Sequence, residues 1–310
     1  MQAVLNAALP VFGLILTGVL CGRFGVFSRA AADSLNRFAI YLALPALMFL
    51  AMSRITPEQI EQGGFSLAFG GGIAASFALG FGLSRWRGRR VAEASIEGLD
   101  AGYSNVGFMG IPLCLLVFGP GSLPAAVIAT LFTACVLFLF AIVLIEVDRH
   151  GDAGLGRAVR RALRSLLVNP LLLAPAAGLA LGLAGMPLPV PAAQFAGLLG
   201  AAASPCALVC IGLFLAQEKA AVRDLRSIGV LVGLKLLFQP AVTAVLAISV
   251  FHLPTAWSHP AVLLSALPIG SGPFTIAKLY GIEAGATSGA ILVSHLVSVG
   301  TVSLLVAWLG

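Results

Sequence analysis

Charged residues are scarce in this chain of 310 residues. Lys, Arg, Asp and Glu together make up 10% of it, whereas soluble globular proteins carry roughly 25%. Hydrophobic residues reach 59%, which excludes a soluble domain with an ordinary charged surface. The composition predicts an all-α polytopic membrane protein, because a helix satisfies its own backbone hydrogen bonds in lipid. The net charge of +6 predicts contact with anionic membrane lipids and not with nucleic acid.

Motifs of enzymes are also missing. The chain has no His/Glu metal motif, nucleophile elbow, pair of catalytic carboxylates or Walker-type loop, which argues against a membrane enzyme or an ATP-driven protein. Cys206 and Cys210 lie one helical turn apart without other ligand-type residues, so we expect apolar packing and no metal. No cofactor is expected. The first apolar run is a full span, so no cleavable signal peptide is expected either.

Apolar segments long enough to cross a bilayer occur ten times. They cover about residues 3–22, 34–53, 65–84, 96–117, 122–146, 166–185, 191–216, 227–251, 260–280 and 286–308. Arginine and lysine gather in the odd-numbered connections, while the even-numbered ones contain Arg54 alone. The positive-inside rule therefore predicts cytoplasmic odd connections and both termini outside. Short loops and abundant Ala, Gly and Arg suggest a bacterial inner (plasma) membrane.

The longest connection, residues 147–165, separates a first half (1–146) from a second half (166–310). Five spans per half is an odd number, so the second half must be inserted upside down relative to the first. Prolines recur in the same order in both halves, at 45 and 205 and again at 112 and 273. We therefore predict two inverted five-helix repeats. Arginines at 157, 160, 161 and 164 follow a helical spacing, which predicts either an amphipathic helix on the membrane surface or a topology signal.

Two spans carry residues that interrupt a helix. Span 9 contains the stretch Pro268–Lys278, and span 4 contains Asn105–Pro112. Proline removes a backbone donor and glycine lowers helix propensity, so we predict broken helices that cross in the membrane. Paired broken spans in corresponding positions of two halves indicate the binding site of a secondary carrier.

The residues at the two breaks suit an anion. The segments after Pro112 and Pro273 are expected to begin at those prolines, so that Ile111, Pro112, Gly272 and Pro273 mark two electropositive points. Gly107, Gly110, Gly270 and Gly272 permit close approach of a ligand or of the other chain segment. The side chains of Asn105 and Ser271 can bind either a carboxylate or the freed backbone.

Ionisable residues inside the spans are costly and therefore informative. Lys235 in span 8 is expected to bind the substrate or to form a buried ion pair. Lys278 either binds the substrate or extends to the membrane surface. Asp100 is a candidate partner of Lys235, a proton or cation site, or a hydrated carboxylate at the interface. His295 is either a proton-coupling residue or a hydrogen-bonded packing residue. At the start of span 2, Asp33 and Arg37 lie four residues apart and predict a structural ion pair.

Several of these stretches resemble the auxin efflux carrier family, which includes the plant PIN-formed auxin exporters and bacterial organic-anion carriers. That family belongs to the bile acid/sodium symporter-like superfamily. The residues that carry the resemblance are Leu35-Asn36-Arg37-Phe38, Leu44-Pro45, Asn105, Met109-Gly110-Ile111-Pro112-Leu113, Asn169-Pro170, Lys235-Leu236-Leu237, Pro240-Ala241, Ala266-Leu267-Pro268, Gly270, Pro273-Phe274 and Ala277-Lys278. They follow the family's order along nearly the whole chain.

The resemblance implies a scaffold of spans 1, 2, 6 and 7, through which two copies are expected to form a homodimer, and a moving transport domain of spans 3–5 and 8–10. It also implies elevator-type transport of a small organic carboxylate held beside the crossing. The residues leave proton symport, sodium symport and uniport open. The competing prediction is a sensor or channel-like protein that uses the same fold without transport.

Overall fold

The computed structural model describes residues 9–55, 63–150, 156, 160, 164, 167–217, 224–283 and 285–309. Regular structure in these residues is helical throughout. Of the amphipathic helix predicted at residues 157–164, the structure describes only Arg160 and Arg164, which are helical and exposed; the rest of that segment lies outside the described residues. Six described helices are long and apolar enough to cross a membrane, and three further apolar helices are shorter. The protein is therefore a multi-pass helical membrane protein, as its composition predicts.

The described helices of the first half follow the five predicted spans in order. They are α1 (Leu9–Arg23), the continuous run α2 (Arg29–Phe38), η2 (Ala39–Ala43) and α3 (Leu44–Ser53), α5 (Gly63–Trp86), α6 (Val91–Gly102) followed by η3 (Val106–Gly110) and α7 (Ile111–Phe118), and the run η4 (Pro120–Ser122), α8 (Leu123–Leu131), η5 (Phe132–Leu137) and α9 (Phe138–His150). The fourth span is interrupted between α6 and η3.

The second half follows the same plan. Its described helices are α11 (Pro170–Leu183), α12 (Val190–Ala201) with α13 (Ala203–Gln217), the run α14 (Leu225–Gly233), η6 (Leu234–Phe238), α15 (Gln239–Ala244) and η7 (Val245–Val250), α16 (Thr255–Ser265) followed by α17 (Gly272–Leu279), and α18 (Gly285–Leu309). The ninth span is interrupted between α16 and α17. Both interruptions lie in the spans where the sequence predicts them, while the inverted arrangement in the membrane stays a prediction.

Polar side chains and glycines set several helix ends. Ser28, Asn169 and Asp224 cap α2, α11 and α14 by accepting a hydrogen bond from a backbone N–H of the first turn. Gly119 follows α7 with φ of 74°, and Gly281 follows α17 with φ of 58°. Both lie in the left-handed region that favours glycine. The two broken spans thus end in the same way.

Three prolines inside long helices follow a widened helical turn. Pro45, Pro112 and Pro240 each lie two residues after a π-helical segment, namely η2, η3 and η6. A proline ring clashes with the carbonyl one turn earlier, and a wider turn relieves that clash without ending the helix. These spans therefore continue through their prolines.

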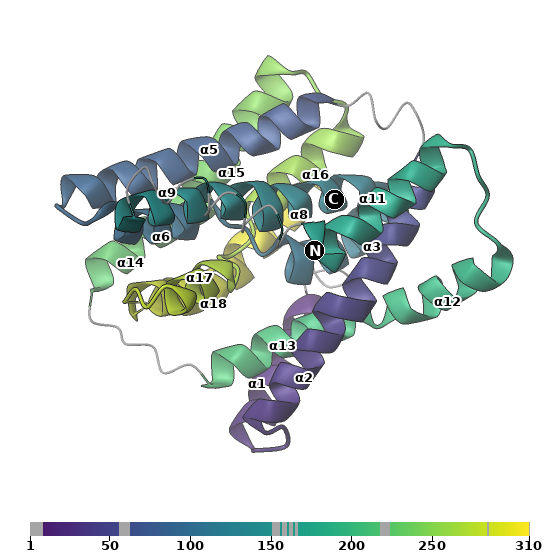
Figure 1. Ribbon diagram of the computed structural model, residues 1–310, viewed down its shortest axis with the longest axis horizontal. Helices are drawn as coiled ribbons and strands as arrows, with labels where there is room; N and C mark the ends of the chain where they lie inside the picture. Colours follow the sequence, from purple (N-terminus) through teal and green to yellow (C-terminus); the bar gives the residue numbers. More distant parts are fainter. Residues whose placement is uncertain are drawn as a thin grey trace.

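Glycines allow the helices of spans 1, 2, 6 and 7 to pack closely (Figure 1). Helix α1 lies along α13, where a Cβ on Gly18 or Gly212 would run into the backbone of the other helix. Helix α11 lies along α3, where a Cβ on Gly178 would meet the carbonyl of Phe49. Small residues at such contacts let membrane helices approach each other. Span 1 thus packs on span 7 and span 6 packs on span 2.

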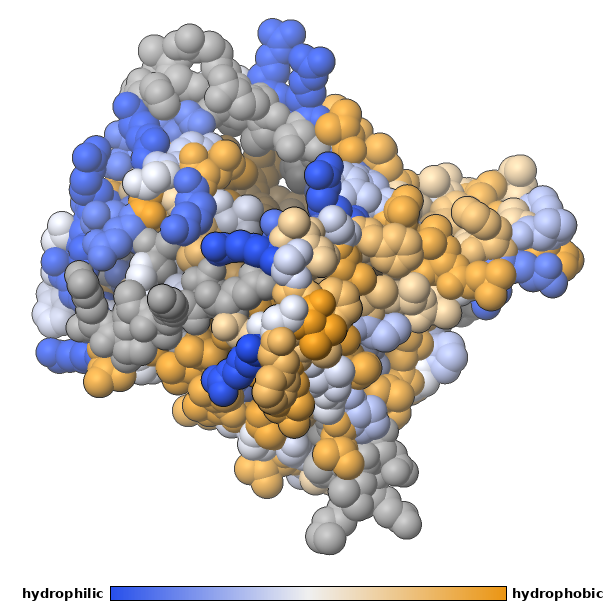
Figure 2. All heavy atoms as spheres, turned by 90° about the horizontal axis from the view of Figure 1, so that it is seen from below, coloured by the Kyte–Doolittle hydropathy of each residue, from blue (hydrophilic) through white to orange (hydrophobic). Residues whose placement is uncertain are grey.

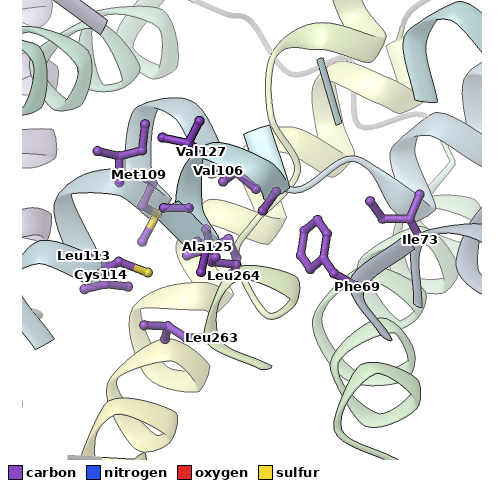
Figure 3. Packing of buried hydrophobic residues seen from close by; sticks show 14 of the residues in the cluster. Phe69, Ile73, Val106, Met109, Leu113, Cys114, Ala125, Val127, Leu263 and Leu264 are labelled. Atoms are coloured by element: carbon purple, nitrogen blue, oxygen red, sulfur yellow. The ribbon is translucent and has the colours of Figure 1, made fainter. Parts of the chain in front are cut away.

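The largest buried cluster lies beside the two interruptions. Figure 3 shows Met109, Leu113 and Cys114, from the segment after the first break, near Leu263 and Leu264 of α16. All five side chains are buried. On the outside, Figure 2 shows hydrophilic residues gathered toward the left of the view, while the part that protrudes on the right is mostly hydrophobic. A largely apolar surface with polar residues at one end suits a lipid environment.

Candidate functional site

The two interrupted spans pair with each other through their backbones. Ser104 and Ile269 form an antiparallel bridge. On one side of it the N–H of Asn105 donates to the carbonyl of Pro268 at 2.9 Å, and on the other the N–H of Gly270 donates to the carbonyl of Tyr103 at 3.1 Å. The two breaks therefore satisfy each other's freed groups, as a break inside a membrane requires.

Span 8 satisfies the carbonyl ends of both half-helices before the breaks. Lys235 is fully buried, and its Nζ donates to the carbonyl of Ser265, the last residue of α16, at 2.6 Å. One turn later, Nε2 of Gln239 donates to the carbonyl of Gly102, the last residue of α6, at 3.3 Å. A cation or amide donor at a helix C-terminus compensates its unpaired carbonyls.

Aromatic rings fix the second break against the first. A Cβ on Gly270 would lie 2.7 Å from the ring of Tyr103, and one on Gly272 would run into the ring of Phe138. The rings of Tyr103 and Phe138 stack with centroids 4.8 Å apart. Glycine is therefore required at both positions by close packing, since any side chain would displace the stacked pair.

A cavity of about 260 Å³ lies between the crossing and helices α2 and α13. Its polar lining combines residues from both halves of the chain: Arg29, Asp33, Asn36, Asn105, Ser271, Thr275 and His295. Apolar residues complete it: Ala32, Phe108, Cys210, Ile211, Phe214, Phe274 and Ile291. An apolar pocket with a few converging polar groups is the usual form of a small-molecule site. The guanidinium of Arg29 offers the fixed donor fork that carboxylates bind.

Asn105 and His295 form a polar contact at the inner wall of this cavity. Nδ1 of His295 lies 2.9 Å from the carbonyl of Ile291, which can only accept, so Nδ1 carries the proton. Nε2 then accepts from Nδ2 of Asn105 at 3.2 Å. This assignment leaves the carbonyl oxygen and the second amide proton of Asn105 available for a ligand. His295 thus positions Asn105 from α18.

The remaining predicted residues lie around the cavity in different roles. Gly107 is half-buried beside the lining residue Phe108, while Gly110, Ile111 and Pro112 are buried in apolar packing. Pro273 occupies the first turn of α17, two residues after Ser271, as the sequence predicts. The helix after the first break begins at Val106 and not at Pro112, because the π-helical turn η3 precedes α7 without interruption.

Lys235 and Lys278 have different environments. Lys235 lies behind the crossing, and no carboxylate forms an ion pair with it in the described part of the chain. Lys278 is exposed, and its Nζ lies 5.3 Å from the centroid of the Phe274 ring. Since Phe274 lines the cavity, Lys278 contacts the outer side of the cavity wall and not the cavity itself.

Two predicted ion pairs do not form. Asp100 is fully buried and accepts from Oγ1 of Thr287 at 2.7 Å, so it is neither the partner of Lys235 nor a hydrated interfacial group. Asp33 makes no ion pair with Arg37 within the described residues and lines the cavity. Arg29, Asp33 and Asn36 therefore line the candidate site, although the sequence did not predict them there. Asn36 lies in one of the family stretches, which was a usable signal.

Comparisons with known proteins identify the family to which the chain belongs. The model of the family described as "Membrane transport protein" matches residues 3–153 and 156–306. A protein of Rhizobium meliloti (strain 1021) named "Putative malonate transporter" is 32% identical over 98% of this chain and 95% of its own length. "Uncharacterized transporter YfdV" of Escherichia coli (strain K12) is 26% identical over 96% of this chain and 94% of its own length. An "Uncharacterized transporter" of Methanothermobacter thermautotrophicus is 27% identical over 77% of this chain and 76% of its own length. The chain belongs to the membrane transport protein family, the family of the auxin efflux carriers.

Proposed function

We propose that this protein is a secondary transporter of small organic carboxylates, with malonate-like acids as its first candidates. The single observation that carries the proposal is the cavity beside the paired helix breaks, lined by Arg29, Asn105 and Ser271. Arg29 provides a cation, Asn105 an amide, and Ser271 lies at the N-terminus of α17, whose dipole favours an anion. The name of the Rhizobium relative supports the same class of substrate.

The proposal includes the finer membrane arrangement. Ten spans would form two inverted repeats, with cytoplasmic odd-numbered connections and both termini outside. Arg29 begins α2 directly after the first connection, so the cavity would face the cytoplasm in this conformation. The glycine contacts of α1 with α13 and of α3 with α11 support a scaffold of spans 1, 2, 6 and 7. A homodimer would form through that scaffold, in a bacterial inner membrane.

An elevator motion fits the composition of the cavity walls. One wall is formed by α2 and α13, from the proposed scaffold, and the other by the crossing, α17 and α18. A site between two bodies opens to the opposite side when one body slides along the other. The transport domain, spans 3–5 and 8–10, would carry Asn105, Ser271 and His295 past the fixed residues Arg29 and Asn36.

Uptake into proteoliposomes tests the proposal. Radiolabelled malonate, malate and indole-3-acetate would be offered with and without imposed proton and sodium gradients, and protein-free liposomes are the control. We expect saturable uptake of malonate, stimulated by unlabelled malonate on the opposite side. That stimulation identifies a carrier, because a channel shows none.

The competing function is a sensor or channel-like protein on the same fold. A sensor would bind malonate, as measured by calorimetry on the purified protein, without any uptake. A channel would give uptake that does not saturate. Either result would contradict a carrier, and the failure of all three acids to bind would contradict a carboxylate site.

A further inference from the structure

A second cavity, of about 100 Å³, lies between α6, the start of α14 and the start of α18. Carboxylates on its lining are Glu93, Glu97, Asp224 and Glu283, and Arg89 lies among them. Glu97 pairs with Arg87 at 3.5 Å. Asp224 is exposed and accepts from the N–H and Oγ of Ser227, which lowers the pKa of that carboxyl. Exposed Glu283 and half-buried Glu93 mark the polar mouth of this cavity.

Thr287 connects this cavity with a buried acid. The side chain of Thr287 lines the cavity, and its Oγ1 donates to Oδ2 of Asp100 at 2.7 Å. Asp100 has no exposed surface, and its Oδ1 has no hydrogen-bond partner within the described residues. An ionised carboxylate buried with one hydrogen bond and no counter-ion is strongly disfavoured. A neutral carboxyl needs no counter-ion and fewer hydrogen bonds, so these surroundings suit a protonated Asp100 better than an ionised one.

The charges around Asp100 supply no counter-ion. Helix α6 packs against α5, α9, α14, α17, α18 and η6. The ionisable groups on or next to these helices, α6 included, are Arg85, Arg87, Arg89, Arg90, Glu93, Glu97, Tyr103, Glu146, Asp148, Arg149, Asp224, Arg226, Lys235, Lys278, Tyr280, Glu283 and His295. Asp148 pairs with Arg90, Lys235 bonds to Ser265, and Lys278 stacks on Phe274. Glu97, one turn before Asp100, is paired with Arg87 and offers no positive charge to it.

We propose that Asp100, reached through Thr287 and the second cavity, is a proton-binding site that couples proton movement to transport. The proton arrives in the cavity as a hydronium ion: Oγ1 of Thr287 accepts it while that hydroxyl gives its own proton to Oδ2 of Asp100, so one O–H bond forms and one breaks at Thr287 and neutral water is left in the cavity. A bound proton replaces the missing counter-ion.

The coupling follows from two polar contacts between the same segments. Asp100 on α6 bonds to Thr287 on α18. Five residues further along the first chain segment and two turns further along α18, Asn105 bonds to His295 in the wall of the substrate cavity. Gain or loss of the proton at Asp100 changes the first contact and thereby the spacing of the second. This inference rests on the proposed function, since it names the ion that drives the same transport.

Infrared spectroscopy tests the proton site without any transport. A protonated carboxyl has a C=O stretch distinct from that of a carboxylate, and we expect this band near neutral pH in the wild type. Asp100→Asn should remove it, whereas Glu93→Gln, at the mouth of the cavity, should leave it. Thr287→Val should keep the band and slow its exchange in heavy water. A wild type without the band, or one that loses it on addition of sodium chloride, overturns the proton site.

Flux measurements then test coupling. A pH-sensitive dye inside proteoliposomes should report proton movement when malonate enters the wild type, and Asp100→Asn should lose this signal while it still exchanges labelled for unlabelled malonate. Proton movement that persists in Asp100→Asn overturns the coupling. If the wild type transports no malonate, the proposed function fails for that acid, and the infrared result decides the proton site independently.

Discussion

The two helix breaks make the same backbone pairing from different sequences. No proline lies between the end of α6 at Gly102 and the restart at Val106, whereas Pro268 and Pro273 flank the second restart. What the two breaks share is a donor from span 8 on the preceding half-helix, Lys235 in one case and Gln239 in the other. A break in a membrane helix therefore depends on partners for its carbonyls more than on proline.

The side chains at the two breaks also differ. The first break presents Asn105, held by His295 and open to the cavity. The second break is packed tightly, with Gly270 and Gly272 against aromatic rings. We infer that the second break holds the geometry while the first recognises the ligand. Changes at the second break should therefore disrupt the packing of the crossing itself, and changes at the first should weaken substrate binding.

The largest effect is expected for Lys235→Met. It leaves the carbonyl of Ser265 buried without a donor, at a cost of about 1–3 kcal/mol. Removal of the buried ammonium offsets part of that cost, so melting temperature should change little while malonate uptake is lost. Lys278→Met, which removes an exposed cation nearby, is the matched control and should retain uptake. Equal loss in both variants would mean that net positive charge matters and not the carbonyl contact.

Gln239, the uncharged donor of span 8, allows a second test of the same comparison. Gln239→Leu removes the weaker donor, to Gly102 at 3.3 Å, and should reduce uptake less than Lys235→Met does. A larger loss in Gln239→Leu would show that the first break, and not the second, holds the geometry of the crossing. Uptake rates normalised to reconstituted protein are the measurement for both variants.

The second largest effect is expected for Gly272→Ala. A methyl group there overlaps the ring of Phe138, and overpacking of this kind costs about 1–3 kcal/mol. Gly107→Ala is the control at the first break, where the nearest atom to an added Cβ is the Thr130 methyl at 3.7 Å. Melting temperature should fall in Gly272→Ala alone, and Phe138→Leu should restore it. A fall of the same size in Gly107→Ala would contradict the difference in packing.

The helices, and the two spans that contain a break, follow from local sequence. Apolar length predicts the spans, and the Pro268–Pro273 stretch predicts the restart of α17, because both effects act within one or two turns. The restart at Val106 could not be predicted in the same way. The sequence marks Pro112, but a π-helical turn absorbs that proline and moves the helix start toward Asn105.

The site residues were predicted only in part because they meet through tertiary packing. Asn105 and Ser271 could be predicted because they lie in the two breaks, which the sequence marks. Arg29 and Asp33 come from α2, and no local pattern places that helix against the crossing. The buried position of Asp100 next to Thr287 depends likewise on how α6 meets α18, 187 residues away in the chain.

A smaller effect is expected for Asn105→Ala. It removes the amide that faces the cavity and its bond with His295, and a hydrogen bond contributes about 0.5–1.5 kcal/mol. The apparent affinity for malonate should fall by roughly tenfold or less, with unchanged melting temperature. Thr130→Val, which removes a hydroxyl bonded within its own helix, is the control. A loss of stability in Asn105→Ala would assign a structural role to this residue.

The smallest effect is expected for Pro273→Ala. Pro273 is in the first turn of α17, where its missing N–H has no helical partner to lose and its fixed φ mainly restricts the unfolded chain. Such a change costs about 0.4–1 kcal/mol of folding stability. The uptake rate should therefore fall by a few fold, and the affinity for malonate should change by no more than a few fold. Pro112→Ala, at the corresponding place after the first break, should act as weakly if the π-helical turn holds its position without the ring. A much larger loss in Pro273→Ala than in Pro112→Ala would mean that the second break needs its proline, and that the partners supplied by span 8 do not suffice there.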